Sequence, residues 1–557
     1  MFFRKKEIKT NVRKQCVVLN YINCFTFYLI LKVSAHMKKL LLSISAIVLL
    51  FTACQRDGVK DKATTNPDSN PSNVLESNDS PVRPNDGTPL SKDQLDERIK
   101  AIMQTKKDFN WAWMDDNFFW SAVNATRPIV AIGYKPTGEG DISDKIHEID
   151  IKSKNWKATH DALVAFILTE YNTLHSDKPL TEKDIMIEDD NVLPRIVVRM
   201  ADYDVLSKIR HLKNVRYMDV LDYSISGDER SGSGCGGTLP ASVPAADLTT
   251  ITPNARVPWN FTTMGIPAAW NTTGAANGAG ITIGVIDAGI SSTQPMLNAD
   301  FASGLSTGRT VTTSATYGTS AFNTCTHGTS MCGLAVGPRN NSGATMGVAW
   351  KSNLKFIRGA EDVILDGSDE QTGVKNAMIE MGNTAAVKVI SISLGTPFYS
   401  GTLEDGVNYA YGKGKMIFAA AGTSTWYTSW WGVIYPAKLE KCVAMTGIKE
   451  SGATCAICHD GSEVDFTITM ERTADSNRNS LSYHSSGTAP SYVGGSSCAT
   501  AMGAGIAALV WSATPTLTRE KVLTALSTTA QYKAAKNGTW GWGRIDPSAA
   551  IAKGKTL

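Results

Sequence analysis

The sequence lacks an excess of either charge sign. Its 557 residues carry 55 Lys or Arg and 52 Asp or Glu, a formal net charge of +3. The first 40 residues hold nine Lys or Arg against one Glu, a net charge of +8, which leaves −5 for the rest. This balance predicts no basic surface for nucleic acid. With 42% hydrophobic residues, the chain is long enough for a large core and several regions.

The apolar run after Met37 is too short for a permanent membrane span, at about twelve residues. It follows two lysines and ends in the sequence TAC at Cys54, which predicts an export signal over residues 37–53. The TAC ending resembles bacterial lipoprotein signals, which implies that Cys54 is lipidated and anchors the exported chain to a membrane. An ordinary signal peptide with an incidental cysteine is the alternative. Residues 1–36 precede a complete signal, so we interpret them as an untranslated or unstructured extension.

Two polar stretches divide the rest of the chain. Residues 54–95 are dominated by Ser, Asn, Pro, Asp and Thr, and have too few apolar residues to offset the entropy of ordering, so a disordered tether is expected. Residues 227–256 are rich in Gly, Ser and Pro, which favours an exposed and easily cut linker. The sequence therefore predicts two folded regions, residues 96–226 and 257–557.

Strand and helix patterns alternate in residues 96–226. Strands are predicted at Pro128–Tyr134, Arg195–Met200 and Val215–Val220, with a helix after each of the first two. Two sets of apolar residues fall on single helical faces: Leu163, Phe166, Ile167 and Leu174, then Val205, Leu206, Ile209 and Leu212. This order favours a small split βαβ sandwich. Such a module carries no chemistry by itself.

Continuous apolar strands such as ITIGVID and VKVISISLG alternate with helical stretches in residues 257–557. Strands without a polar face, separated by helices, indicate a mainly parallel sheet covered by helices on both faces. In such a sheet the polar active groups are expected at the carboxyl ends of the strands.

Three polar residues of this domain stand where they can do chemistry. Asp287 closes an apolar strand, His327 precedes a helix of small residues, and Ser497 lies in the first turn of an apolar helix, where N–H groups favour developing negative charge. Each has an ordinary structural interpretation alone: a turn residue, a hydrogen-bonded histidine and an N-cap. Together they supply the carboxylate, imidazole and hydroxyl of nucleophilic hydrolysis, in the order Asp, His, Ser.

From about Val257 onward the chain resembles the subtilases, the subtilisin-like serine proteases. VIDAGI, HGTS and GSSCATA resemble the three motifs around the catalytic Asp, His and Ser, and MGVAW, ISISLG, YPAK and GWGRIDPSAA are further matches. The resemblance implies an α/β subtilisin-like fold and a monomeric endopeptidase that acts on proteins or peptides through an acyl-enzyme, without a cofactor for catalysis. It assigns Ser497, and not Ser496, as the nucleophile.

The same resemblance implies the walls of a substrate cleft. Ser393, Leu394 and Gly395 should pair with an extended peptide through main-chain hydrogen bonds. Ala421 and Gly422 should form part of the opposite wall. An ordinary buried strand is the alternative for these residues.

Thr423 departs from the family pattern. Subtilases usually carry Asn here, and its amide donates to the oxyanion together with the backbone at Ser497. Loss of such a donor costs about 3 to 4 kcal/mol of transition-state stabilisation. A Thr hydroxyl also donates, but it reaches less far and can rotate away. We therefore expect a protease that works slowly; the alternative is a catalytically weak or inactive peptide-binding protein with the subtilase fold.

Residues 96–226 resemble, by position and element order, the inhibitory prodomain of this family, a small ferredoxin-like α+β domain. The resemblance implies that it blocks the cleft until the enzyme cuts the linker at 227–256. Because Cys54 lies on the prodomain side, this cut would free the catalytic domain from its lipid anchor. The expected location is the bacterial cell envelope, with release to the exterior after processing.

Seven cysteines follow Cys54, and this odd number predicts at least one free thiol. The sequence CAICH, Cys455–His459, matches the haem c attachment pattern and raises an electron-transfer function as a further alternative. It has no cytochrome-like helical surroundings, so a disulfide that involves Cys455 or Cys458 is expected instead.

Two further segments leave alternatives open. PRNNSGATMGVAW resembles the family's calcium loop, with Asn341 at a ligand position, but Asn-Asn-Ser-Gly is also an ordinary turn. Four aromatic residues follow Thr423 and either line an apolar pocket or pack a surface loop: Trp426, Tyr427, Trp430 and Trp431.

Overall fold

The computed structural model describes residues 74–77, 87–225, 235, 242–274, 276–325, 327–424 and 432–557. Several predictions concern residues outside this set: the extension 1–36, the signal at 37–53, lipidation of Cys54, and the aromatic residues Trp426, Tyr427, Trp430 and Trp431. They stay predictions.

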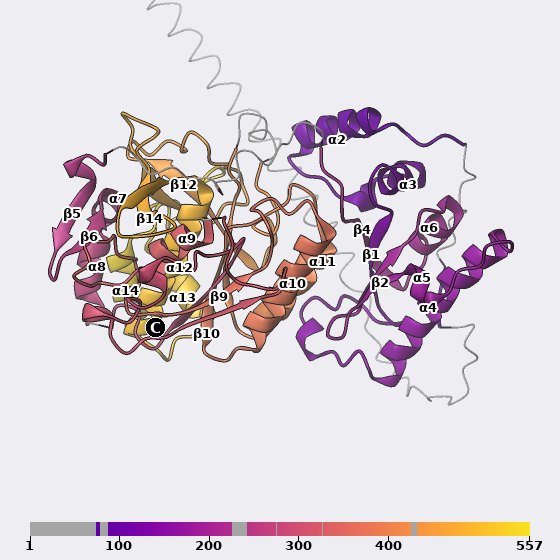
Figure 1. The fold of residues 1–557 in the computed structure, drawn as a ribbon, viewed down its shortest axis with the longest axis horizontal. Helices are drawn as coiled ribbons and strands as arrows, with labels where there is room; N and C mark the ends of the chain where they lie inside the picture. Colours follow the sequence, from indigo (N-terminus) through magenta and orange to yellow (C-terminus); the bar gives the residue numbers. More distant parts are fainter. Residues whose placement is uncertain are drawn as a thin grey trace, which may run out of the picture. The chain divides into compact units, whose positions relative to one another are not determined.

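The N-terminal domain is a four-stranded antiparallel sheet with strand order β2-β3-β1-β4. Its elements, drawn in indigo to magenta in Figure 1, are α2 (Lys92–Lys106), α3 (Asp116–Asn124), β1 (Ile129–Tyr134), α4 (Lys154–Leu174), α5 (Glu182–Ile185), β2 (Met186–Asp189), β3 (Arg195–Arg199), α6 (Tyr203–Arg210) and β4 (Val215–Val220). The order β1-α4-β2-β3-α6-β4 is the split βαβ arrangement that the sequence predicts.

The start of this domain differs from the predicted boundary at residue 96. Helix α2 begins after Ser91, whose side chain accepts from the N–H of Gln94 while Gln94 reaches back to the Ser91 N–H. This capping box satisfies two N–H groups of the first turn and makes the end of the expected tether helical. On α4, Leu163 and Ile167 are buried, whereas Leu174 is 45% exposed. The buried face of α4 is therefore shorter than predicted.

The C-terminal domain is built on a seven-stranded parallel sheet with strand order β13-β12-β11-β10-β7-β9-β8. The strands are β7 (Thr282–Asp287), β8 (Val311–Ala315), β9 (Asn353–Arg358), β10 (Val387–Ile392), β11 (Met416–Ala420), β12 (Cys442–Lys449) and β13 (Phe466–Glu471). The central strands are buried along their length, which explains their continuous apolar pattern. The predicted parallel sheet is confirmed.

Helices cover both faces of this sheet. They are α7 (Trp259–Thr263), α8 (Ile266–Thr272), α9 (His327–Val336), α10 (Ser368–Asn383), α11 (Gly401–Gly412), α12 (Gly495–Ala513), α13 (Arg519–Ser527) and α14 (Pro547–Gly554). One core cluster packs α9, α12 and α14 on the sheet. A second cluster packs α10 and α11 on it, and these two helices lie next to each other in Figure 1. The layered α/β architecture is as predicted.

Helix α12 is the apolar helix of small residues in which Ser497 lies. It is long and apolar enough to cross a membrane, but nearly all its side chains are buried inside the C-terminal domain. It packs on β10, β11 and β12. Its composition is therefore that of a central core helix, whose small side chains permit close packing on the sheet.

The predicted linker at 227–256 is too long at its C-terminal end. Strands β5 (Leu248–Ile251) and β6 (Ala255–Pro258) form an antiparallel hairpin that belongs to the C-terminal domain. Just before it, Asp247 is fully buried and pairs with Arg472 and Arg478. Arg472 and Arg478 are remote in sequence from Asp247, and these ion pairs fix its position. The Pro and Thr content of the surrounding sequence indicates only a turn-rich segment. A second hairpin, β14 (Ser480–Tyr483) and β15 (Pro490–Val493), precedes α12.

Candidate active site

Asp287 and His327 form a buried pair at the carboxyl edge of the parallel sheet. Asp287 is the last residue of β7, and His327 is the first of α9. Nδ1 of His327 lies 2.8 Å from Oδ1 of Asp287, which also accepts from the N–H of Ala288 at 2.8 Å. Asp287 is fully buried and His327 is 9% exposed. The carboxylate thus orients the imidazole ring.

The electrostatics of His327 favour its protonated form. Burial alone would lower the pKa of His327, but the charge and the hydrogen bond of Asp287 raise that pKa above its ordinary value. The charge of Asp362 acts in the same direction. A histidine in this setting accepts a proton readily, which is what a general base requires.

Ser497 lies at the same sheet edge. Its carbonyl oxygen accepts from Oγ of Ser393 at 3.3 Å, and Ser393 follows the last residue of β10. Because β10 pairs with β7, this contact places the first turn of α12 beside the strand that ends in Asp287. Among the described residues, Ser497 Oγ makes no hydrogen bond. Such a bond to a histidine is often long in an enzyme without substrate.

Ser496 and Ser497 differ sharply in their surroundings. Ser496 is fully buried, its Oγ accepts from the N–H of Gly422 at 3.0 Å, and the same oxygen lies 3.2 Å from Oγ1 of Thr423. Ser497 is 9% exposed. The contacts engage the hydroxyl of Ser496 and leave that of Ser497 available.

Thr423 lies against the first turn of α12. Its Oγ1 accepts from the N–H of Ser496 at 3.1 Å. Gly494, the N-cap residue of α12, has no side chain that could accept from the N–H groups of the first turn. Thr423 therefore caps the helix from a distant segment. The sequence identifies Thr423 as a substitute for Asn, but it gives no sign of this contact with Ser496.

The expected cleft walls are only partly available for peptide pairing. The N–H of Gly395 donates to Val363 O at 2.9 Å, and its carbonyl accepts from the N–H of Leu365 at 2.9 Å. Both main-chain groups of Gly395 are thus paired with residues 363–365, and its pairing with a peptide stays a prediction. Ala421 and Gly422 also have their N–H and C=O groups engaged. The pairing of Ser393 and Leu394 with a peptide also stays a prediction.

Two disulfides join four of the seven cysteines that follow Cys54. Cys235 bonds to Cys325, two residues before His327, and Cys455 bonds to Cys458. The buried cysteines Cys332, Cys442 and Cys498 are free. The predicted disulfide at Cys455 or Cys458 is present, and it uses both sulfurs that haem attachment would need. The pairing of Cys235 has no signal in the sequence.

The CAICH loop packs behind the Gly422–Ser424 segment. The N–H of Ser424 donates to Ile457 O at 2.6 Å, and the N–H of His459 donates to Gly422 O at 2.9 Å. His459 is buried, and this burial lowers its pKa to about 4 against the opposing effects of the Gly432 backbone and the Asp460 charge. A neutral, buried histidine here supports the backbone beside Thr423.

The calcium site that the resemblance implies at Asn341 stays a prediction. Its carbonyl accepts from Nδ2 of Asn254 at 3.2 Å. Next to it, Oδ1 of Asn340 accepts from the N–H of Ser342 at 3.1 Å, and Nδ2 of Asn340 contacts Sδ of Met296 at 3.4 Å. Within the described part of the chain, no cluster of three His, Cys, Asp or Glu residues could hold a metal. Calcium prefers carboxylate and carbonyl oxygens, and two oxygens of this loop already accept hydrogen bonds.

The model of the subtilase family matches residues 278–543, which include all three predicted residues. Subtilisin E of Bacillus subtilis (strain 168) is 30% identical over 299 residues, which cover 53% of this chain and 71% of that protein. Thermitase of Thermoactinomyces vulgaris is 28% identical over 293 residues, 51% of this chain and 92% of that protein.

The chain belongs to the subtilase family. Subtilases are serine proteases, and this subtilase has their fold. Among solved structures, the MycP3 protease of the type VII (ESX-3) secretion system aligns with a TM-score of 0.43 and 23% identity, over 57% of this chain and 90% of that one.

Proposed function

We propose that this subtilase is a serine endopeptidase in which Ser497 is the nucleophile, His327 the general base and Asp287 the residue that orients His327. The carrying observation is the 2.8 Å hydrogen bond between His327 Nδ1 and Asp287 Oδ1, at the sheet edge that the first turn of α12 also reaches. This arrangement supplies the base and the nucleophile of acyl transfer.

The proposed reaction has two steps. Ser497 Oγ bonds to the substrate carbonyl carbon, and its proton passes to Nε2 of His327. His327 then gives this proton to the amine as the peptide C–N bond breaks, which leaves an acyl-enzyme. Water attacks the ester in the same way and restores the hydroxyl of Ser497. The N–H of Ser497 and the hydroxyl of Thr423 are the proposed donors to the oxyanion.

The N-terminal domain acts as the inhibitory prodomain in this proposal. Its carboxylates meet the N-termini of two catalytic-domain helices: Asp222 Oδ1 accepts from the N–H of Ser368 on α10 at 2.7 Å, and Asp219 Oδ2 accepts from the N–H of Thr402 on α11 at 3.1 Å. Anions are favoured at helix N-termini. These contacts support a specific docking of the sheet on the α10–α11 pair.

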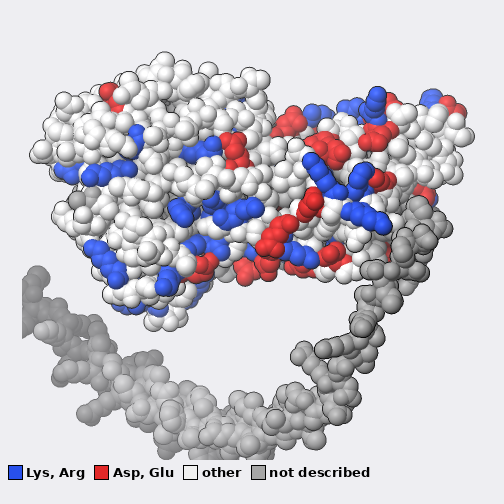
Figure 2. Space-filling model, turned by 90° about the horizontal axis from the view of Figure 1, so that it is seen from below, with Lys and Arg blue, Asp and Glu red and all other residues white. Residues whose placement is uncertain are grey.

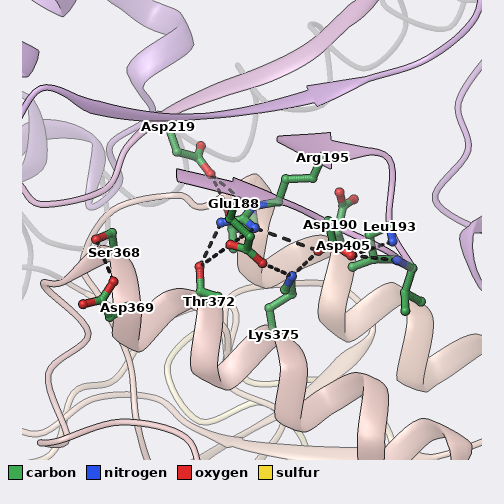
Figure 3. A network of polar contacts seen from close by, with 12 residues as sticks. Glu188, Asp190, Leu193, Arg195, Asp219, Ser368, Asp369, Thr372, Lys375 and Asp405 are labelled. Carbon is green, nitrogen blue, oxygen red and sulfur yellow. Dashed lines mark hydrogen bonds and ion pairs between the residues drawn. The ribbon is translucent and has the colours of Figure 1, made fainter. Parts of the chain in front are cut away.

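A buried ionic cluster joins the same two surfaces (Figure 3). Lys375 of α10, fully buried, binds Asp190 and lies 3.0 Å from Oε1 of Glu188. Arg195, also fully buried, contacts Glu188 at 2.7 Å and reaches Thr372 of α10 at 2.9 Å. Buried ion pairs add little net stability, because desolvation offsets their attraction. Water can solvate these charges again when the two domains separate. Such a contact therefore suits an inhibitory domain that must dissociate.

An aromatic contact completes this interface. Phe398 of the catalytic domain lies against three rings of the N-terminal domain, with centroids 5.5 Å from Phe109, 5.6 Å from Trp111 and 6.0 Å from Tyr223. Aromatic packing of this kind stabilises a contact beyond the area that it buries.

The proposed precursor is exported and anchored through Cys54, with residues 37–53 as its signal. Processing then occurs in the linker, which the hairpin β5–β6 limits to residues before Asp247. The substrates are proteins or peptides, and the active form is a monomer. Figure 2 shows Lys and Arg interspersed with Asp and Glu on the visible face, which favours no nucleic-acid partner.

A fluorophosphonate probe tests the proposed activity. The purified chain from Cys54 onward and its Ser497→Ala variant are incubated with the probe, and the products are weighed as intact proteins. We expect labelling and loss of the N-terminal domain in the wild type alone. A folded wild type that shows neither would contradict the proposal and favour the alternative of a peptide-binding protein.

A further inference from the structure

We propose that Ser496 is a positioning residue that fixes the direction of the Thr423 hydroxyl and makes it an oxyanion-hole donor. This inference rests on the proposed function. It explains how this subtilase can stabilise a tetrahedral intermediate with Thr at a position where an Asn amide is usual.

Three hydrogen bonds link the two residues to the first turn of α12. The N–H of Gly422 donates to Oγ of Ser496 at 3.0 Å. The N–H of Ser496 donates to Oγ1 of Thr423 at 3.1 Å. The two hydroxyl oxygens lie 3.2 Å apart, and either could be the donor.

The surroundings decide which hydroxyl donates. Ser496 is fully buried, and among the described residues Thr423 is the only acceptor within reach of its proton. If Thr423 donated instead, the proton of Ser496 would stay unpaired in the interior, which costs free energy. Ser496 is therefore the donor. Thr423 Oγ1 then accepts twice, and both of its lone pairs are used.

The proton of Thr423 must consequently point away from Ser496. Thr423 is exposed, in contrast to Ser496. Its side chain lies over the first turn of α12, because a Cβ on Gly495 would lie 2.4 Å from Thr423 Oγ1. The N–H of Ser497, the other proposed donor, belongs to the same turn. The geometry thus fixes a rotatable hydroxyl before substrate binds, which is the condition for effective oxyanion stabilisation.

A double-mutant cycle tests this inference through kcat and KM for a peptide ester. Removal of the Thr423 hydroxyl in Thr423→Val should lower kcat about 100-fold, in the range observed for the loss of one oxyanion donor. Ser496→Ala should lower kcat about tenfold at constant KM, because Thr423 keeps its hydroxyl but loses its fixed direction. In the double variant Ser496→Ala should cause no further loss.

Two conservative variants and a stability measurement serve as controls. Thr423→Ser and Ser496→Thr keep both hydroxyls and should keep most of kcat. The midpoint of thermal unfolding identifies any variant that fails to fold. Losses that multiply in the double variant, or a Ser496→Thr variant as slow as Ser496→Ala, would overturn the proposed positioning role. Absence of turnover in the wild type, equal to that of Ser497→Ala, would overturn the proposed function itself.

Discussion

A Cβ atom on Gly328 would lie 2.3 Å from the carbonyl oxygen of Gly289. This close approach brings the first turn of α9 against the turn that follows β7. It allows His327 and Asp287, each one or two residues away, to reach 2.8 Å. The small residue beside the histidine is therefore part of what builds the proposed catalytic pair.

Replacement of this glycine should separate the pair. In Gly328→Ala the new methyl group must displace the backbone of Gly289, so we expect kcat/KM for a peptide ester to fall at least tenfold, together with a lower midpoint of thermal unfolding. Gly538→Ala is a matched control, because a Cβ there meets nothing within 4 Å. Equal activity in both variants would show that the close approach is not needed.

The pH dependence of the reaction should report on Asp287. The reaction requires neutral His327. Burial would lower the pKa of His327, but Asp287 raises it above the ordinary value, and this places the acid limb of the profile at a higher pH. Asp287→Asn removes the charge, so the acid limb should move to lower pH while kcat falls by about 10⁴. The measurement is kcat/KM against pH. An acid limb that stays in place would mean that another group titrates.

The folded chain should become more stable in mild acid. Burial raises the pKa of Asp219 to about 6 from the ordinary 3.8, so the folded chain binds an extra proton between about pH 4 and pH 6. Burial alone would raise the pKa of Glu188, but Arg195 and Lys375 lower this pKa to about 2. The stabilising contribution of Glu188 is therefore lost only as the pH falls from 4.5 toward 2.

We therefore expect the Ser497→Ala chain to gain about 1 kcal/mol of unfolding free energy between pH 7 and pH 5 from Asp219. Urea unfolding at the two pH values measures it. Asp219→Asn removes the carboxyl group, and the difference between the two pH values should shrink by that amount. A difference that is unchanged in this variant would contradict the role of Asp219.

Removal of calcium by EDTA should not change the thermal stability of the protein through the loop around Asn341. The N–H and Oγ of Ser342 both donate to Oδ1 of Asn340, and Nδ2 of Asn340 lies 3.4 Å from Sδ of Met296, so the polar groups of this turn are paired with each other. We expect the same midpoint of thermal unfolding in EDTA and in millimolar calcium. A higher midpoint in calcium, abolished in Asn341→Ala, would show that this loop binds the ion after all.

The sequence predicts those features that depend on local pattern. The buried strands β7 and β10 appear as continuous apolar runs, and Asp287 and His327 lie in motifs whose chemistry restricts their neighbours. Features that depend on contacts between remote segments are not predicted. Asp247 looks like a linker residue until Arg472 and Arg478 are placed beside it, and the tie between Thr423 and Ser496 spans 73 residues. The pairing of Gly395 with Val363 likewise needs the fold.

If the chain is processed as proposed, the disulfide between Cys235 and Cys325 determines what a cut in the linker separates. A cut on the N-terminal side of Cys235 divides the molecule into two separate chains, and the N-terminal domain can diffuse away. A cut between Cys235 and Asp247 leaves two chains that are still joined by sulfur, with the junction two residues from His327. In that case proteolysis alone would not release the proposed inhibitor, and the Cys235–Cys325 bond would also have to be reduced.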